Sequence, residues 1–476
     1  MEHEREFYID GRWQAPLSDR TLEVIDPSTE ASCGRIAAGS AADIDRAVSA
    51  ARAAFPGYAR TTTRERIELL GAILEGFDRN IEPLAQAMAK EMGVPLRAAR
   101  NIHYPSGPAH LKETMRVLET FRFDEPRGTT LVAREPIGVC GLITPWNFPV
   151  NQLVCKIAPA LGAGCTMVLK PSEVSPLSAL LIAQILHDAG VPPGVFNLVN
   201  GDGATAGHAL AAHADVDMIS FTGSTRAGVL IAKAAADTVK RVGQELGGKS
   251  ANILLPDADF ERAVALGAAR CFNNSGQSCI APTRMLVPMD RMDEAAALAA
   301  QVADKVRVGL ASDEDSEIGP VANRAQYEKV TGLIRRGIEE GARLAAGGVG
   351  RPEGLSRGFF IRPTVFADVT PEMAIAREEI FGPVLSIMGY RDVDDAVRLA
   401  NDTPYGLAAY IQGRDVDQAR DVARRVRAGN VQLNYPPVDR GAPFGGYKQS
   451  GNGREWGEYG LHEYLEIKGI VGYERA

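Results

Sequence analysis

The regular alternation of β-rich and helical segments after Gly138 restricts the fold of this chain more than any other feature. Short runs at 138–144, 166–169, 195–199 and 217–221 predict strands, and each is followed by a helical segment. For example, Ser175 as N-cap and Pro176 at the first helical position predict a helix that ends at Gly190. This rhythm favours a parallel sheet with helices on both faces, and therefore an α/β fold.

A second alternating block runs from Ala251 to about Val431. It contains strand candidates at Arg284–Val287 and Pro383–Ile387 and a helical candidate at Met292–Val306. Since 476 residues are too many for one ordinary core, the length predicts two or three lobes.

Two further segments differ from this rhythm. Arg64–Met92 is amphipathic and predicts one long helical region closed by Gly93. Phe121–Arg134 surrounds a Pro-Arg-Gly turn with β-formers and predicts a hairpin.

Composition and charge argue against several classes of protein. A net charge of −8 without a basic face gives no reason to expect nucleic acid as a partner. The N-terminus is charged, and the longest apolar run, 138–150, is broken by Pro145 and Asn147, so we expect no membrane segment and a cytoplasmic location. The six cysteines form no disulfide framework, and without clustered Cys and His no metal site is expected.

The segment 272–280, FNNSGQSCI, contains the strongest candidate for a nucleophile. Small polar neighbours can present the sulfur and the backbone N–H of Cys279 to a substrate, provided that the surroundings favour the thiolate. The alternative is a packed loop cysteine. Cys271 lies in a more helical context and is interpreted as structural.

Two other segments offer groups that could assist such a nucleophile. Glu245 precedes Gly247 and Gly248 with little bulk around it, as suits a mobile general base, although a solvated turn would look the same. Asn147 lies between two prolines in TPWNFP and offers an amide donor for an oxyanion, although such a turn can be purely structural.

Cofactor-binding candidates follow the predicted strands. Lys170 and Glu173 in KPSE follow the strand 166–169 and can hydrogen-bond ribose hydroxyls, with an exposed charged turn as the alternative. The glycine-rich loops 201–207 and 223–228 could offer N–H groups to a pyrophosphate, but both depart from GxGxxG.

Seven segments occur together in a fixed order: TPWNFP, KPSE, FTGST, ELGGKS, GQSC, EEIFGPV and PFGGYKQSG. In this the chain resembles the aldehyde dehydrogenase superfamily over nearly its whole length. The resemblance implies a Rossmann-like cofactor domain (1–119 and 139–247), an α/β catalytic domain (248–447) and a small β oligomerisation arm (120–138 and 448–476). An exposed two-stranded arm is marginal alone and needs a partner edge, so the implied fold favours a homodimer or a homotetramer.

The resemblance also implies a reaction, the oxidation of an aldehyde to a carboxylic acid with NAD(P)+. Cys279 would attack the carbonyl to form a hemithioacetal, and Asn147 and the Cys279 backbone N–H would hold the oxyanion. Loss of hydride to the nicotinamide would leave a thioester, which water activated by Glu245 would hydrolyse. The resemblance places Lys170 both among these catalytic residues and among the cofactor-binding residues.

The cofactor would be NAD, with NADP left open, because a carboxylate at Glu173 would repel a 2′-phosphate. By the same resemblance, the cofactor-binding residues would come from the ends of the strands and from the EEIFGPV segment. They are Ile143, Thr144, Pro145, Trp146, Lys170, Ser172, Glu173, Gly203, Gly207, Phe221, Thr222, Gly223, Ser224, Leu246, Glu379 and Phe381.

The substrate mouth would include Gln152, Val438 and Phe444, a mixture that favours a medium-sized aliphatic or aromatic aldehyde. Arg440 has two interpretations, as a partner for a substrate carboxylate or as a surface residue paired with Asp439. The alternative activities are a CoA-acylating semialdehyde dehydrogenase, in which CoA replaces water, and a non-catalytic relative with a structural or binding role. The presence of Glu245 favours hydrolysis.

Overall fold

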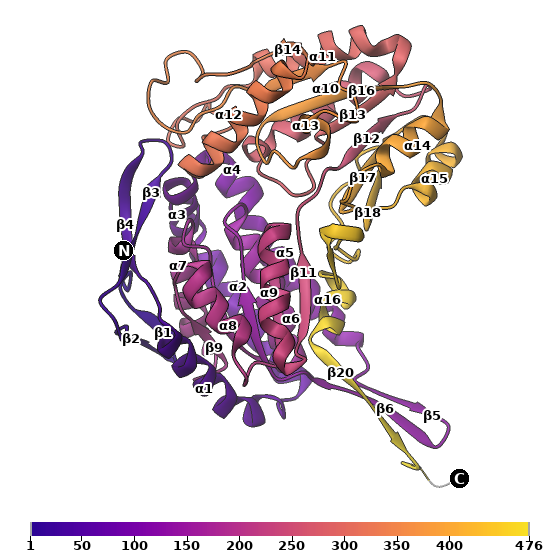
Figure 1. Ribbon diagram of the computed structural model, residues 1–476. Coiled ribbons are helices and arrows are strands. Elements are labelled where there is room, and N and C mark those ends of the chain that lie inside the picture. Colours follow the sequence, from indigo (N-terminus) through magenta and orange to yellow (C-terminus); the bar gives the residue numbers. More distant parts are fainter. Residues whose placement is uncertain (1, 475–476) are drawn as a thin grey trace.

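Two sheets form the cores of two lobes in this computed structural model, which describes residues 2–474 (Figure 1). Five neighbouring strands of the first sheet, β11 to β9, are parallel, as predicted, and antiparallel strands extend both edges. In spatial order the strands are β19 (Gly451–Asn452), β11 (Arg241–Glu245), β10 (Met218–Thr222), β7 (Val139–Ile143), β8 (Thr166–Lys170), β9 (Phe196–Leu198), β1 (Phe7–Ile9) and β2 (Arg12–Gln14).

Strands β7, β8 and β10 are buried along their whole length, because helices pack on both faces of this sheet (Figure 1). The helical segments of the lobe are α1 (Ala41–Tyr58), α2 (Thr63–Arg79), α3 (Ile81–Met92), α4 (Leu96–Ala98), η1 (Ala99–His103), α5 (Tyr104–Thr120), α6 (Pro149–Ala163), α7 (Pro176–Asp188), η2 (Gly203–Gly207), α8 (His208–Ala212), α9 (Thr225–Ala235) and η3 (Ala236–Thr238).

The second lobe contains a seven-stranded sheet that is parallel except for its edge strand β14. Its order is β14 (Arg343–Ala346), β15 (Thr364–Ala367), β16 (Val384–Tyr390), β13 (Arg284–Pro288), β12 (Ala251–Leu254), β17 (Ala408–Gln412) and β18 (Asn430–Leu433). The helical segments here are α10 (Phe260–Phe272), η4 (Asn273–Gly276), η5 (Met289–Arg291), α11 (Met292–Lys305), α12 (Arg324–Glu339), α13 (Ala374–Arg377), α14 (Val393–Asn401) and α15 (Val416–Arg425).

A three-stranded arm projects away from both lobes (Figure 1). It consists of β5 (Asp124–Arg127), β6 (Thr130–Pro136) and β20 (Leu465–Val471), which confirms the predicted hairpin and adds the C-terminal strand. Two further strands, β3 (Thr21–Asp26) and β4 (Ala31–Ala37), form a separate hairpin.

Three details differ from the sequence predictions. The helical region 64–92 is interrupted at Asn80, whose φ of −118° and ψ of 24° separate α2 from α3. The side chain of Ser175 does not cap α7; instead the Glu91 carboxylate from α3 accepts hydrogen bonds from the N–H groups of Leu177 and Ser178.

The sequence predicts that the C-terminal segment 448–476 belongs to the arm, and this is only partly correct. Strand β19 pairs with β11 of the first sheet, and α16 (Gly457–Glu463) packs on α5 and α6. Only β20 extends into the arm, so this segment connects the arm to the first lobe and carries residues close to the end of β11.

Candidate active site

A tight loop after α10 presents Cys279 to a pocket. Asn274, Ser275 and Gly276 all have left-handed backbone, with φ of 51°, 56° and 72°. A Cβ at Gly276 would lie 2.0 Å from the Gly382 carbonyl oxygen, so only glycine fits there. The loop places Cys279 half-buried in the pocket wall, whereas Cys271 is fully buried within α10.

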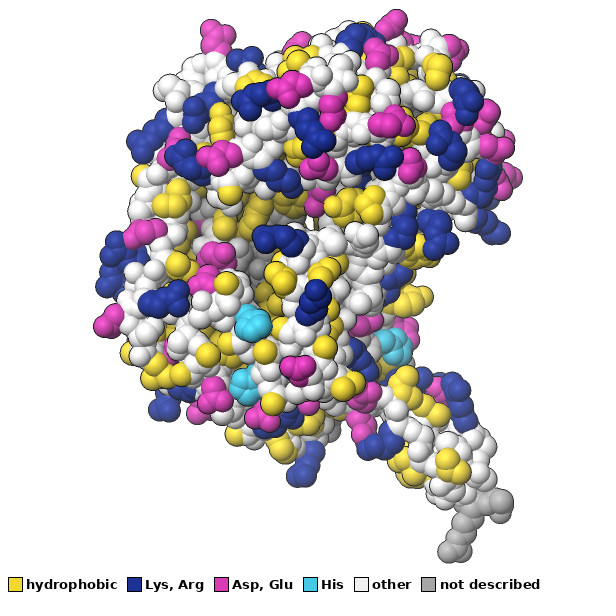
Figure 2. Space-filling model, in the orientation of Figure 1, with side chains coloured by type: hydrophobic (Ala, Val, Ile, Leu, Met, Phe, Trp, Pro, Cys, Tyr) yellow, Lys and Arg dark blue, Asp and Glu magenta, His cyan; other side chains and the backbone are white. Residues whose placement is uncertain are grey.

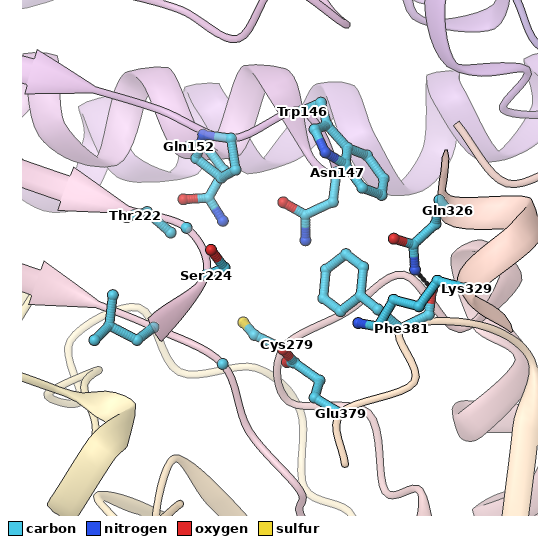
Figure 3. A pocket seen from close by; sticks show the side chains of 14 residues that line it. Trp146, Asn147, Gln152, Thr222, Ser224, Cys279, Gln326, Lys329, Glu379 and Phe381 are labelled. Carbon is cyan, nitrogen blue, oxygen red and sulfur yellow. Dashed lines mark hydrogen bonds between the residues drawn. The ribbon is translucent and has the colours of Figure 1, made fainter. Parts of the chain in front are cut away.

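Asn147 lies directly against this loop, after the end of β7. Its Nδ2 donates to the Gln277 carbonyl (3.1 Å), and Asn274 Nδ2 donates to the Asn147 carbonyl (2.8 Å). In Figure 3 the amide of Asn147 and the sulfur of Cys279 are directed toward the same space. The structure thus brings together the predicted nucleophile and the predicted oxyanion donor.

We call the cavity around this sulfur the cysteine pocket. It lies between the lobes, where Figure 2 shows a hollow with hydrophobic side chains on its walls. Its lining contains Pro145, Trp146, Asn147, Gln152, Thr222, Gly223, Ser224, Leu246, Gly247, Cys279, Gln326, Lys329, Glu379 and Phe381. Nearly all of these residues come from the segments singled out in the sequence.

Gln326 and Lys329 are lining residues that the sequence reasoning missed. Both lie on α12 and approach Phe381 from the side opposite to Gln152 (Figure 3). Gln326 Nε2 donates to the Phe381 carbonyl (2.7 Å), and burial lowers the pKa of Lys329. No motif marks α12 in the sequence, so only the folded arrangement identifies them.

The other predicted cofactor residues lie along the carboxyl edge of the first sheet, where α/β proteins bind nucleotides. Lys170 ends β8, and its Nζ lies 3.1 Å from Glu173 Oε2. Gly207 in η2 has its Cβ position 3.8 Å from the Lys170 side chain, and the space at Gly203 is open. The rest of this set follows or ends the neighbouring strands: Ile143, Thr144, Ser172 and Phe221.

The chemistry of this edge fits a dinucleotide. Ser224 caps α9 with its hydroxyl, so backbone N–H groups at the start of a helix lie beside the pocket, as a pyrophosphate requires. The Glu379 carboxylate accepts from the Gly248 N–H (2.9 Å) and can accept from ribose hydroxyls. Trp146 and Phe381 meet edge to face at 5.5 Å and offer apolar walls for a flat ring.

Glu245 ends β11 but does not line the cysteine pocket. Its carboxyl group lies in a small neighbouring cavity, the glutamate cavity, together with Glu455, Glu463 and Arg454. Neither carboxyl oxygen has a hydrogen-bond partner among residues 2–474. The expectation that Glu245 and Cys279 meet in one pocket is therefore not met in this conformation.

Burial and the nearby Glu455 carboxylate raise the pKa of Glu245 well above its ordinary value. Glu455 in turn forms an ion pair with Lys156, whose Nζ also donates to Ser220 Oγ (3.0 Å). The glutamate cavity therefore holds a buried carboxyl group with a raised pKa beside a network of charged groups.

The electrostatic surroundings of Cys279 favour the thiol. Burial raises its pKa most, and the carboxylates of Glu379 and Glu245 raise it further. Since a thiol pKa above its ordinary value lies well above 7, the sulfur is protonated at neutral pH.

Beyond Cys279 the pocket continues into a wider hollow of about 1200 Å³, the substrate mouth. Three predicted residues line it: Gln152, the exposed Val438 and the buried Phe444. Arg440 also lines it, and the expected ion pair with Asp439 is not present; its guanidinium stacks on Trp456 instead.

Comparisons with known proteins agree with this geometry. The family model described as "Aldehyde dehydrogenase family" matches residues 13–470. The chain belongs to the aldehyde dehydrogenase family. A relative from Pseudomonas sp, "3-succinoylsemialdehyde-pyridine dehydrogenase", is 54% identical to this aldehyde dehydrogenase over 475 residues. The match covers 100% of this chain and 100% of the relative.

Solved structures of aldehyde dehydrogenases superimpose closely on this one. A mutant of aldehyde dehydrogenase C from Pseudomonas syringae, in complex with NAD+ and octanal, has a TM-score of 0.99 at 56% identity, with 100% of this chain and 98% of the other covered. An aldehyde dehydrogenase from Mycobacterium tuberculosis, in complex with NAD+, has a TM-score of 0.96 at 40% identity, with 98% of each chain covered. The α/β fold with a Rossmann-like lobe and a catalytic lobe is confirmed.

Two searches for other features were negative within residues 2–474. No group of three or more His, Cys, Asp or Glu side chains in this range could hold a metal ion. No helix in the same range is long and apolar enough to span a membrane.

Proposed function

We propose that the protein oxidises an aldehyde to a carboxylic acid with NAD+ through a thioester on Cys279. One observation supports this more than any other. The Cys279 sulfur and the Asn147 amide lie in one pocket, which extends on one side to the nucleotide-fitting edge of the first sheet and on the other to the substrate mouth.

In the first step the Cys279 thiol gives its proton to solvent water and the sulfur bonds to the carbonyl carbon. The carbonyl oxygen takes the electron pair, and the Asn147 amide and the Cys279 backbone N–H stabilise its charge; a preorganised donor of this kind contributes about 3–4 kcal/mol. When bound, NAD+ supplies the acceptor for the hydride that leaves this carbon, so that a thioester remains on Cys279.

In the second step water attacks the thioester and the C–S bond breaks, which releases the carboxylic acid and the Cys279 thiolate; the thiolate then takes back a proton. Glu245 takes the proton of that water, so its carboxyl group must be charged and must turn from the glutamate cavity toward Cys279. Since no hydrogen bond to residues 2–474 holds it in place, the rotation breaks none.

NAD+ is the preferred cofactor because the half-exposed carboxylate of Glu173 lies beside Lys170, where a ribose 2′-phosphate would meet a like charge. The NAD+ complexes of the similar dehydrogenases from Pseudomonas syringae and Mycobacterium tuberculosis support this choice. A kcat/KM for NADP+ equal to or above that for NAD+ would contradict it.

The arm supports a homodimer or homotetramer. Ile467 and Val471 on β20 are 70% and 84% exposed, and β20 pairs on one side only, with β6. A second copy of the chain would cover this edge. Sedimentation of the protein with Ile467→Asp and Val471→Asp should show smaller particles than the unchanged protein.

The activity itself is tested by mixing the purified protein with octanal and NAD+. Absorbance of NADH should rise with the aldehyde, and mass spectrometry should identify octanoic acid with and without CoA. Absence of aldehyde-dependent NADH for a panel of aldehydes would refute the proposal, and formation of an acyl-CoA in place of the acid would establish the acylating alternative.

A further inference from the structure

One positively charged side chain in the wall of the substrate mouth has no anionic partner. Arg440 lies in the loop after β18, and its guanidinium has neither a hydrogen bond nor an ion pair with any of residues 2–474. Burial lowers the pKa of Arg440, which still leaves it charged at every physiological pH. A half-buried cation without a partner is costly unless a ligand supplies the opposite charge.

The guanidinium is held in place by an aromatic platform. Its central carbon lies 4.4 Å from the centre of the Trp456 ring. Trp456 is stacked in turn on Phe444, with ring centres 4.4 Å apart and planes 19° apart. A guanidinium held over a ring still has N–H groups that can bind a planar acceptor such as a carboxylate with two hydrogen bonds.

The acidic residues of the mouth are occupied elsewhere. Asp439 Oδ1 accepts from the Gly441 N–H (2.9 Å), and its charge acts on Arg116. Glu455 forms its ion pair with Lys156 at the border of the glutamate cavity. Neither carboxylate neutralises Arg440.

Two further ionisable neighbours, Cys155 and His110, add no negative charge; burial raises the pKa of the Cys155 thiol well above its ordinary value. His110 lies 5.4 Å from Trp456 and bonds through Nε2 to Asn151 Oδ1 (3.0 Å). Burial first, and then the charge of Arg440, lower the pKa of His110 to about 3, so it is neutral at physiological pH. Arg440 is therefore the source of a local positive field in the mouth.

We propose that Arg440 binds a carboxylate at the far end of the substrate, which makes the preferred substrates aldehydes that also carry a carboxylate. This rests on the proposed function, because the aldehyde end must reach Cys279 and Asn147 at the inner end of the same mouth. Gln152 and Gln432 also line this mouth.

The experiment compares pairs of aldehydes that differ only in the far group, butanal with succinic semialdehyde and octanal with 8-oxooctanoate. The unchanged protein should show a kcat/KM at least about tenfold higher for the carboxylate-bearing member of one pair. Arg440→Gln should remove that preference, mainly through KM, and leave the neutral member within about twofold. Arg440→Lys keeps the positive charge but cannot form the paired hydrogen bonds of the guanidinium, so it should restore part of the preference for the carboxylate-bearing aldehyde.

Arg427→Gln provides a matched control. Arg427 also faces an aromatic ring, that of Tyr447 at 6.0 Å, but it is exposed and does not line the mouth. This variant should keep the preference of the unchanged protein.

Each outcome decides between the two proposals. Equal kcat/KM for both members of both pairs in the unchanged protein would overturn the role of Arg440, even if Arg440→Gln did not fold. An equal loss for both members in Arg440→Gln would show a structural role only and would also overturn it. Either result would leave the proposed function intact, whereas a protein that oxidises no member of either pair would count against the function itself.

Discussion

The cysteine pocket and the glutamate cavity lie on the two sides of the end of β11, and they are built differently. Leu246 lines the first and Glu245 the second, because successive side chains along an extended chain point to opposite sides. In the cysteine pocket the loop around Gly276 and the turn around Asn147 hold each other by hydrogen bonds. In the glutamate cavity the carboxyl group of Glu245 has no hydrogen-bond partner among the described residues.

This difference suggests that formation of the thioester depends on groups held in place, and that its hydrolysis depends on a group free to rotate. In the proposed mechanism, attack on the aldehyde uses groups that are already fixed in one pocket, whereas hydrolysis needs the Glu245 side chain to leave its cavity. Variants of the cysteine pocket should therefore affect the first half of the reaction, and variants of the glutamate cavity the second.

The largest effect is expected for Cys279→Ala, because no other described group in the pocket can form the thioester. The turnover number should fall by at least about 10⁴. The measurement is NADH formation under saturating aldehyde and NAD+.

Cys271→Ala is the matched control, since Cys271 lies eight positions earlier and is buried in α10. It should keep kcat within about twofold below its unfolding temperature. A comparable loss of kcat in Cys279→Ala and Cys271→Ala would contradict the assignment of the cysteine pocket as the active site.

Asn147→Ala should have the next largest effect. Loss of the amide removes an oxyanion donor, so kcat should fall by about 10²–10³ and the rapid first turnover of NADH should disappear. Since Asn147 also bonds to Gln277, a thermal melt should accompany the kinetics. A folded variant that keeps its rapid first turnover would place the oxyanion elsewhere.

Glu245→Gln should slow hydrolysis only. Steady-state turnover should fall by about 10²-fold, while a burst of about one NADH per site persists, because attack and hydride loss do not need this carboxyl group. Glu463→Gln changes another carboxyl group of the same cavity and should alter kcat much less. Loss of the burst in Glu245→Gln would break the proposed division between the two sites.

The smallest effect concerns pH. Because the pKa of Cys279 is raised, the thiolate fraction without nucleotide should increase about tenfold per pH unit up to and beyond pH 9. Iodoacetamide labelling of the Cys279 peptide, followed by mass spectrometry, should show this slope. A plateau reached below pH 8 would mean that the sulfur is already a thiolate at rest.

The sequence predicted the parts of the site that lie in short ordered segments. The turn around Asn147, the loop around Cys279 and the end of β8 at Lys170 each carry local patterns, and the sheet places them on one edge. The strand and helix pattern also predicted both lobes and the hairpin of the arm.

The sequence could not predict what depends on contacts between distant segments. Gln326 and Lys329 reach the pocket only because α12 packs beside the loop at Phe381. The direction of Glu245 depends on the C-terminal segment, since Gly445 and β19 lie against the end of β11. Arg440 was recognised as ambiguous, and only its stacking on Trp456 distinguishes the two interpretations.

The most direct measurement of the central claim is a covalent trap. Glu245→Gln mixed briefly with octanal and NAD+, then denatured and digested, should yield a peptide in which Cys279 carries an octanoyl group. The same treatment of Cys279→Ala should yield none. Release of NADH by the Glu245→Gln protein with no acyl group on Cys279 at any time would contradict the account.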